Sequence, residues 1–390
     1  MEHDEFAAFI QEKWNSYRIE GWECYRLKEK LKRMKNDLKQ WTREVFGHID
    51  KKMEDARNQI KRLDQKDDDG DLIEAEVEER KNCFQELWEW SKARDNLLFQ
   101  KSRQKWLQEG DANSKYFHGC IVRRRKLNGI EGIWKNDIWV EEVSEVKQYI
   151  KEYFERKFDE EEWERPDLDL KNLKQLGEED NKSLISEFSE EEIREAVWCC
   201  NGNKSRGPNG FNFNFIKKMW PILKEDIVAF AKEFWANGKL VRGSNASFIV
   251  LIPKKENPQE LGEFRPISLI GSMYKIISKI LANRLSKVLP SIISLTQSAF
   301  IGGRQIADGI VIANKVIHEA KRCKRPTLIF KADFEKAYDC VNWEFLNRMM
   351  DKLGFCMKWR MWIKQCISTA AISILVNGSP TEEIHMKRGL

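Results

Sequence analysis

Residues 327–343 read TLIFKADFEKAYDCVNW, and this stretch decides how the rest of the chain is interpreted. Four β-prone residues, 327–330, precede Asp333, and helix-favouring residues follow it. The pattern predicts a buried strand with a carboxylate at its end. Carboxylates bind the Mg²⁺ that phosphoryl transfer requires, so Asp333 is a candidate metal ligand, with capping of a following helix as the alternative. Tyr338 follows five residues later, where its ring would reach a sugar held over the metal.

Two stretches N-terminal to this one carry related motifs. Residues 251–285 read LIPKKENPQELGEFRPISLIGSMYKIISKILANRL, and residues 296–310 read TQSAFIGGRQIADGI. In this order and spacing, the three blocks resemble reverse transcriptases of the non-LTR (LINE-type) retrotransposon family, which is a more specific signal than one short motif. Residues 106–118, WLQEGDANSKYFH, resemble plant members of that family more weakly.

The resemblance implies an α+β fold class and an RNA-directed DNA polymerase activity. The expected architecture is a helical N-terminal hairpin or extension followed by a partial reverse-transcriptase right-hand fold, with fingers and an incomplete palm. By resemblance, Asp333 and the backbone carbonyl of Phe334 hold Mg²⁺, and Tyr338 lies under the deoxyribose and rejects a 2′-hydroxyl. Lys254 and Arg265 would contact the triphosphate, as a point charge and as a fork. The implied partners are template RNA, a DNA primer and deoxynucleoside triphosphates.

The resemblance is interrupted at residues 388–390, where the next motif of the family begins. Two-metal polymerisation needs several carboxylates, and the 390 residues contain one of the family's three. We therefore expect a truncated fragment that is inactive alone. The alternative is a nucleic-acid-binding or protein-interaction remnant without catalysis. A metal nuclease is a weaker third interpretation, because clustered carboxylates and histidines are missing.

Composition limits the remaining options. The chain has 390 residues, 41% of them hydrophobic and 34% charged, which predicts two or three globular domains. The net charge of +5 is too small to establish a polyanionic partner. The charge is uneven, however: residues 101–126 contain eight basic and two acidic residues, whereas residues 159–195 contain five basic and fifteen acidic ones.

Cysteine usage and the N-terminus bear on location. The nine cysteines are scattered without a C-x-x-C pair, so neither a zinc site nor a disulfide framework is indicated. The N-terminus lacks the pattern of a signal peptide, and no run of 18 apolar residues occurs. We expect an intracellular protein, in a nuclear or cytoplasmic ribonucleoprotein, that is not secreted and has no membrane span.

The N-terminal quarter has the spacing of a helical hairpin. Apolar residues recur in heptads from Leu27 to Leu63 with a local slip between Val45 and Met53, and a second stripe runs over residues 73–98. The acidic turn between the stripes is not an EF-hand loop, because Gln65 occupies its first ligand position. The predicted coiled-coil-like hairpin is a structural element or a surface for a partner or for self-association.

Two basic stretches are candidates for nucleic-acid binding. Residues 101–126 interleave basic side chains with aromatic ones, as in grooves for single strands, although an ordinary basic surface has the same composition. Residues 203–211, NKSRGPNGF, form a basic turn that meets a phosphate backbone or simply joins two helices; Arg206 and Asn209 replace the family's usual Pro and Asp. The candidate contacts are Lys105, Lys115, Tyr116, Arg123, Arg124, Arg125, Lys204, Arg206 and Arg304.

These signals divide the chain at residues 105 and 195. The expected domains are a helical hairpin (1–105), a basic and aromatic extension with an acidic linker (106–195), and the fingers and partial palm (196–390). Local patterns predict helices over 143–158 and 273–289, hairpins around 130–140 and 372–386, and a capping box from Ser189 to Glu192. Asp339 is expected to cap the helix over 342–353.

Overall fold

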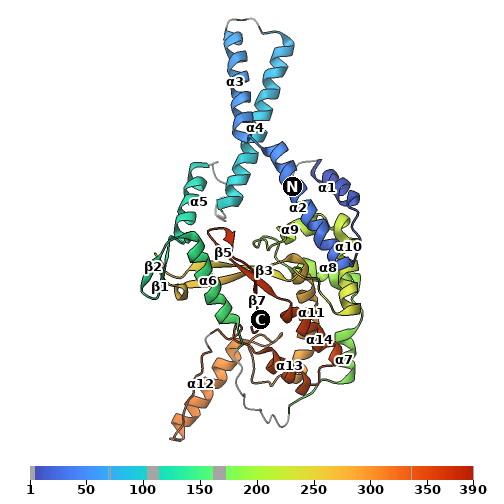
Figure 1. Cartoon of the computed structure of the whole chain (residues 1–390), viewed down its shortest axis with the longest axis vertical. Coiled ribbons are helices and arrows are strands. Elements are labelled where there is room, and N and C mark those ends of the chain that lie inside the picture. The colour runs from blue at the N-terminus through green and yellow to red at the C-terminus, as the bar shows by residue number, and fades with distance from the viewer. Residues whose placement is uncertain are drawn as a thin grey trace. The chain divides into compact units, whose positions relative to one another are not determined.

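The computed structural model describes residues 5–68, 70, 72–102, 114–160, 173–334 and 336–389. The fold is a mixture of helices and sheet, in agreement with the α+β prediction (Figure 1). The helices are α1 (Glu5–Ser16), α2 (Glu23–Phe46), α3 (Ile49–Asp68), α4 (Glu74–Ser102), α5 (Ser114–Asn128), α6 (Val143–Phe158), α7 (Glu178–Ile185), α8 (Glu190–Cys199), α9 (Phe213–Lys218), α10 (Trp220–Asn237), η1 (Leu261–Glu263), α11 (Ser272–Ile292), α12 (Ile306–Arg322), α13 (Trp343–Lys352) and α14 (Met357–Ser368). The strands are β1 (Ile133–Lys135), β2 (Ile138–Val140), β3 (Ala246–Pro253), β4 (Phe264–Ile270), β5 (Ala371–Val376), β6 (Ser379–Pro380) and β7 (Ile384–His385).

The larger sheet is built around strands β3 and β5, which are far apart in the sequence. They pair in parallel, with Ala246 opposite Ala371 and Val250 opposite Leu375. β4 lies on the other side of β3, while β6 and β7 pair with β5 in antiparallel fashion. The buried residues of these strands are Ile249 and Leu251 of β3 and Ala371, Ile372, Ile374 and Val376 of β5, so both strands contribute to the core.

Two tight turns follow the sequence predictions. Asn136 and Asp137 join β1 to β2, and Asn377 and Gly378 join β5 to β6; all four residues have positive φ. Positive φ at both central positions is the type I′ geometry, whose twist matches that of paired strands. The hairpins predicted around 130–140 and 372–386 are therefore confirmed.

The chain forms two compact units. One contains residues 1–34, 132–251 and 265–390, and the other contains residues 35–131 and 252–264. The bounds of these two units differ from the domain bounds expected from the sequence. The division into three domains stays a prediction. Among the described residues, no helix combines the length and apolarity needed to cross a bilayer.

The helical hairpin of the second unit consists of α3 and α4 (Figure 1). The single long helix expected from residue 27 onward is instead divided at Gly47 and His48, where His48 adopts a φ of 65°. The slip in the heptad spacing between Val45 and Met53 coincides with this break. Buried α3 residues, Met53 and Ile60 among them, supply the apolar face of the hairpin.

The first helices dock on α10 through half-buried polar groups. The indole Nε1 of Trp14 donates to a carboxylate oxygen of Asp226 at 2.8 Å, and Lys30 pairs with the same carboxylate at 2.8 Å. Glu233 of α10 accepts hydrogen bonds from the first two backbone amides of α2 and so caps that helix. Residues 1–34 therefore pack within the first unit.

The predicted buried strand at residues 327–330 is wrong in this structure. Residues 325–334 form neither helix nor strand, and Leu328, Ile329 and Phe330 expose 93%, 65% and 88% of their surface. A strand requires a hydrogen-bonded neighbour. In the described part of the chain, the larger sheet consists of β3, β4, β5, β6 and β7, and residues 327–330 pair with none of these strands.

A buried arginine joins α11 to the segment around α8. The Arg284 guanidinium binds both carboxylate oxygens of Glu192 at 2.7 Å and donates to the backbone carbonyls of Leu184, Ser186 and Glu187. The cation also lies 4.5 Å from the ring of Phe188. Ser189 caps α8 as predicted, by accepting from the Glu192 amide, but the Glu192 side chain reaches Arg284 rather than completing a capping box.

Replacing this arginine should destabilise the first unit strongly. We expect Arg284→Met to lower the free energy of unfolding by about 3 kcal/mol, because Glu192 keeps a poorly solvated charge and three carbonyls lose their donor. Urea denaturation followed by circular dichroism measures the effect. Lys232→Met is the control, because its pair with Glu187 is about half exposed and contributes at most about 1 kcal/mol. Equal losses in the two variants would contradict the assignment.

Candidate functional site

The segment that carries the predicted catalytic residues lies at the surface. Asp333 is exposed, Phe334 exposes 80% of its surface, and Tyr338 exposes 60%. Residues 336–340 form a turn closed by a hydrogen bond from the Cys340 amide to the Lys336 carbonyl at 3.2 Å. Asp333 and Tyr338 are thus accessible to a ligand, and Tyr338 lies within this short turn.

Asp339 does not cap the helix that follows it. The N-cap of α13 is Asn342, whose side chain accepts from the Phe345 amide at 2.7 Å. Asp339 instead pairs with Lys157 of α6 at 2.6 Å. Its predicted structural role therefore acts through a helix distant in sequence, for which the local sequence gives no signal.

The turn predicted to meet phosphate is fastened to the start of α11. Gly207 lies so close to the backbone of Ile270 that an added Cβ would be 2.4 Å from its carbonyl oxygen, which requires glycine here. The Asn209 amide donates to the hydroxyl of Ser272 at 2.5 Å. Lys204 and Arg206 are exposed on this anchored turn, and Arg265 is exposed on β4.

Lys254 lies in the loop that joins β3 to β4. Its Nζ donates to the Gly262 carbonyl at 2.8 Å, and its backbone amide donates to Glu263 at 2.8 Å. The Glu263 carboxylate binds Lys255 and accepts from the amides of Gln259 and Glu260, which closes a capping box around η1. Lys255 and these amides hold the pKa of Glu263 below its usual 4.5. The loop is thus ordered around one carboxylate.

The basic helix α5 presents its cations in several directions. Arg123, Arg124 and Arg125 are all exposed. Successive residues of an α-helix are about 100° apart, so three consecutive arginines cannot all face one groove. Tyr116 is 45% exposed and contacts Phe117 edge-on, and the neighbouring Cys120 raises the pKa of Tyr116.

Three other residues were predicted to contact nucleic acid, namely Lys105, Lys115 and Arg304. Lys105 lies outside the described residues, as does the side chain of Lys115. The Arg304 guanidinium donates to backbone carbonyls at the end of α11 and in the turn after it, at Pro290, Ile293, Ser294 and Gln297. Arg304 therefore stabilises a helix end, and its contact with nucleic acid stays a prediction.

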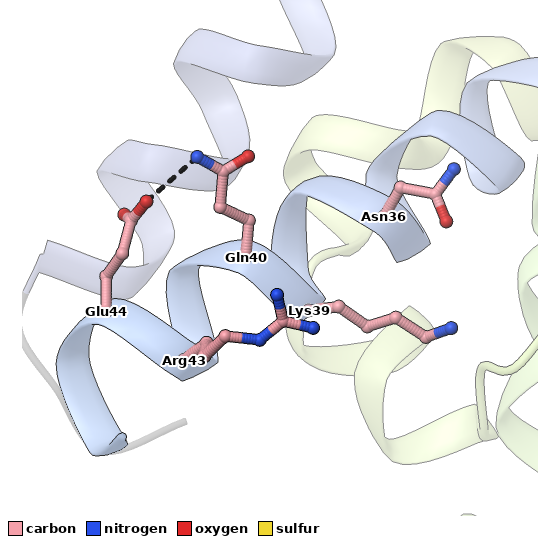
Figure 2. Close-up of a pocket in the computed structure, with 5 residues that line it drawn as sticks. All are labelled: Asn36, Lys39, Gln40, Arg43 and Glu44. Atoms are coloured by element: carbon pink, nitrogen blue, oxygen red, sulfur yellow. Dashed lines mark hydrogen bonds between the residues drawn. The ribbon is translucent and has the colours of Figure 1, made fainter. Parts of the chain in front are cut away.

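No preformed metal cluster accompanies Asp333 in the described ranges. Within them, no three His, Cys, Asp or Glu side chains gather closely enough to hold an ion. Open surface hollows lie elsewhere, one on α12 and one on α2, and Figure 2 shows the residues of the α2 hollow. The α2 hollow follows a single helix face, and its lining residues are Asn36, Lys39, Gln40, Arg43 and Glu44. Neither hollow contains a predicted catalytic residue.

Comparison with known proteins agrees with the motifs. The profile of the reverse transcriptase (RNA-dependent DNA polymerase) family matches residues 252–390, which include Lys254, Arg265, Asp333 and Tyr338. The transposon TX1 uncharacterized 149 kDa protein of Xenopus laevis is 23% identical over 411 residues, covering 100% of this chain and 30% of the relative.

Two further relatives are Pol polyproteins of type-1 retrotransposable elements. The R2 protein of Nasonia vitripennis is 28% identical over 160 residues, 41% of this chain and 15% of its own. The R1 protein of Bradysia coprophila is 22% identical over 176 residues, 44% of this chain and 17% of its own.

This chain matches the reverse transcriptase family over residues 252–390, and its relatives support the non-LTR type. It spans less than a third of the length of these relatives. The family assignment rests on the motifs and on these matches, and it holds although residues 327–330 do not form the expected strand. The first 251 residues lie outside the family profile and are matched by the Xenopus relative.

The loop around Lys254 should loosen on acidification. A carboxylate whose pKa is lowered on folding stabilises the fold above its unfolded pKa, 4.5, and loses that contribution as the pH falls through the lower folded value. We expect amides 259 and 260, corrected for intrinsic rates, to exchange faster as the pH drops below 4.5, and Glu263→Gln to show fast exchange already at pH 7. Glu256→Gln, in the same loop, is the control. Unchanged exchange in Glu263→Gln would refute the role of this carboxylate.

Proposed function

We propose that this chain supplies the nucleotide-binding part of an RNA-directed DNA polymerase. The observation that carries the proposal is the family match over residues 252–390, which contain the exposed residues Asp333 and Tyr338. In this proposal the exposed cations Lys254 and Arg265 neutralise the triphosphate, and Tyr338 packs against the deoxyribose.

Asp333 and Phe334 offer donor atoms of the type that binds a hard cation. A carboxylate and the carbonyl of Phe334 are oxygen donors, as Mg²⁺ prefers. When bound, Mg²⁺ would offset charge on the phosphates and align the reacting oxygens. Since no carboxylate cluster forms among the described residues, further carboxylates must join Asp333 before two ions can be held. We therefore propose that these 390 residues do not polymerise on their own.

Primer extension tests this part of the proposal. The purified chain, given an oligo(dT) primer on poly(rA) with Mg²⁺, should extend nothing. In a longer form of the protein that does extend the primer, Asp333→Asn should reduce synthesis to background, because a metal ligand is lost. Asp339→Asn should mainly lower stability, by about 1 kcal/mol for a partly exposed pair. Extension by the purified chain, or equal activity losses with normal folding, would contradict this division of roles.

A non-catalytic, RNA-binding role is the second candidate, and the exposed arginines of α5 favour it. Phosphate contacts release counterions, so affinity for single-stranded RNA should fall steeply with salt. We expect Arg123→Ala and Lys126→Ala, which change exposed cations three residues apart on one face of α5, each to reduce the salt slope by about one in filter-binding assays. Arg242→Ala, which removes a cation 85% exposed on its side chain, is the control. Identical slopes in all variants would exclude α5 as the binding element.

Partners and cellular location are proposed as well. Template RNA and a DNA primer are the proposed partners, together with deoxynucleoside triphosphates, and self-association through the α3–α4 hairpin stays a proposal. No disulfide joins the nine cysteines in the described part of the chain. An intracellular setting, in a nuclear or cytoplasmic ribonucleoprotein, is consistent with reduced thiols and is proposed on that basis.

A further inference from the structure

Three segments that are far apart in the sequence meet at the end of α6. The first contact is the ion pair between Lys157 Nζ and Asp339 Oδ2, 2.6 Å apart, with side chains only 13% and 32% exposed. The ammonium group also lies 5.6 Å from the ring of Phe154 and 5.3 Å from that of Phe158. Both rings are buried, so the cation is held by aromatic faces as well as by the carboxylate.

Residues 387–389 form the second set of contacts with α6. The Lys387 amide donates to the Phe158 carbonyl at 3.0 Å, and Arg388 Nε donates to the Lys157 carbonyl at 3.0 Å. These bonds satisfy carbonyls that a helix end leaves without partners. Lys387 Nζ also pairs with Asp159 at 2.8 Å and holds the pKa of that carboxyl below its usual 3.8.

Gly389 connects this segment to the turn after Tyr338. Its amide donates to the Val341 carbonyl at 2.8 Å, and its carbonyl accepts from Trp343 Nε1 at 2.7 Å. Its φ is +88°, and an added Cβ would lie 2.8 Å from the Asp339 carbonyl oxygen. Both observations require glycine at this position. The end of α6 therefore encloses the side chain of Asp339, and Gly389 packs against its backbone.

Asp339 directly follows Tyr338, whose own side chain is 60% exposed. The preceding residues, 327–334, are exposed as well and pair with no strand of the sheet. The enclosed carboxylate is thus a fixed point at the end of an otherwise accessible segment.

We infer that Lys157 is a positioning residue for the nucleotide pocket, acting through Asp339 to fix the turn that carries Tyr338. The inference rests on the proposed function, because it assigns the pocket to that turn. Helix α6 lies N-terminal to the family-matched region and thereby contributes to discrimination between deoxyribose and ribose. Lys157 itself need not touch the nucleotide.

Hydrogen exchange tests the anchoring in the full chain. Lys157→Met keeps an apolar stem against the two phenylalanine rings and removes the charge. We expect amides 340, 341 and 389 to exchange about tenfold faster in this variant, whereas those of β3 and β5 stay unchanged. Lys157→Arg should restore most of the protection. Lys151→Met is the matched control, because Lys151 lies on the same helix and pairs at 2.6 Å with Glu382.

Nucleotide binding tests the positioning role. The measured quantity is the affinity for deoxyadenosine triphosphate divided by the affinity for adenosine triphosphate, both with Mg²⁺ and a primer–template. This ratio does not depend on the fraction of folded protein. Lys157→Met should reduce this ratio about tenfold, which corresponds to a loss of about 1.4 kcal/mol in sugar discrimination by Tyr338. Lys151→Met should leave the ratio unchanged.

The possible results distinguish a failure of the positioning role of Lys157 from a failure of the proposed function. An unchanged ratio in Lys157→Met, or unchanged exchange at amides 340, 341 and 389, overturns the inference. If Lys157→Met does not fold, the same two measurements on Asp339→Asn decide it. A wild-type chain that binds neither nucleotide overturns the proposed function and leaves the exchange comparison to decide the anchoring.

Discussion

The parallel pairing of β3 with β5 is the constraint on which the first unit depends. Its register sets Ala246 opposite Ala371, so two strands that are far apart in the sequence are held side by side. Asn245, which is 3% exposed, fixes the start of this register by donating to the Cys366 carbonyl at 2.7 Å and to the Thr369 hydroxyl at 3.2 Å. A buried amide with two specific acceptors permits few other alignments, because a shifted strand would leave those groups without partners. Burial in the same place raises the pKa of the Cys366 thiol to about 12, which keeps it neutral.

Polar groups hold the helices around this sheet in defined places. Arg284 ties α11 to the carbonyls before α8, and Asp226 and Glu233 of α10 receive the first helices of the chain. Apolar contacts alone tolerate sliding between helices, whereas a buried charge with directed partners does not. The cores supply most of the driving force, and these networks select one arrangement.

The proposed site has the opposite character. Asp333 and Tyr338 are exposed on the segment between α12 and α13, and the cations Lys254, Arg265, Lys204 and Arg206 are exposed on a loop, an outer strand and a turn. Each of these carriers is anchored at a point beside the functional residue: Glu263 orders the first loop, Gly207 and Asn209 fasten the basic turn, and Lys157 and Gly389 enclose Asp339. Anchored ends with accessible side chains suit a surface that must accept a charged ligand.

The sequence by itself determined the features that depend on near neighbours. The bounds of α6, the N-cap at Ser189, the type I′ turns at 136–137 and 377–378, and the family motifs around Asp333 were all readable from periodicity, capping and short patterns. Only the tertiary structure decided that 1–34 join the first unit, that 327–330 remain unpaired, and that Lys157 rather than the α13 terminus receives Asp339. The physical reason is range: hydrophobic periodicity and turn chemistry act within a few residues, whereas strand partners and ion pairs are chosen by whichever distant segment the fold brings alongside.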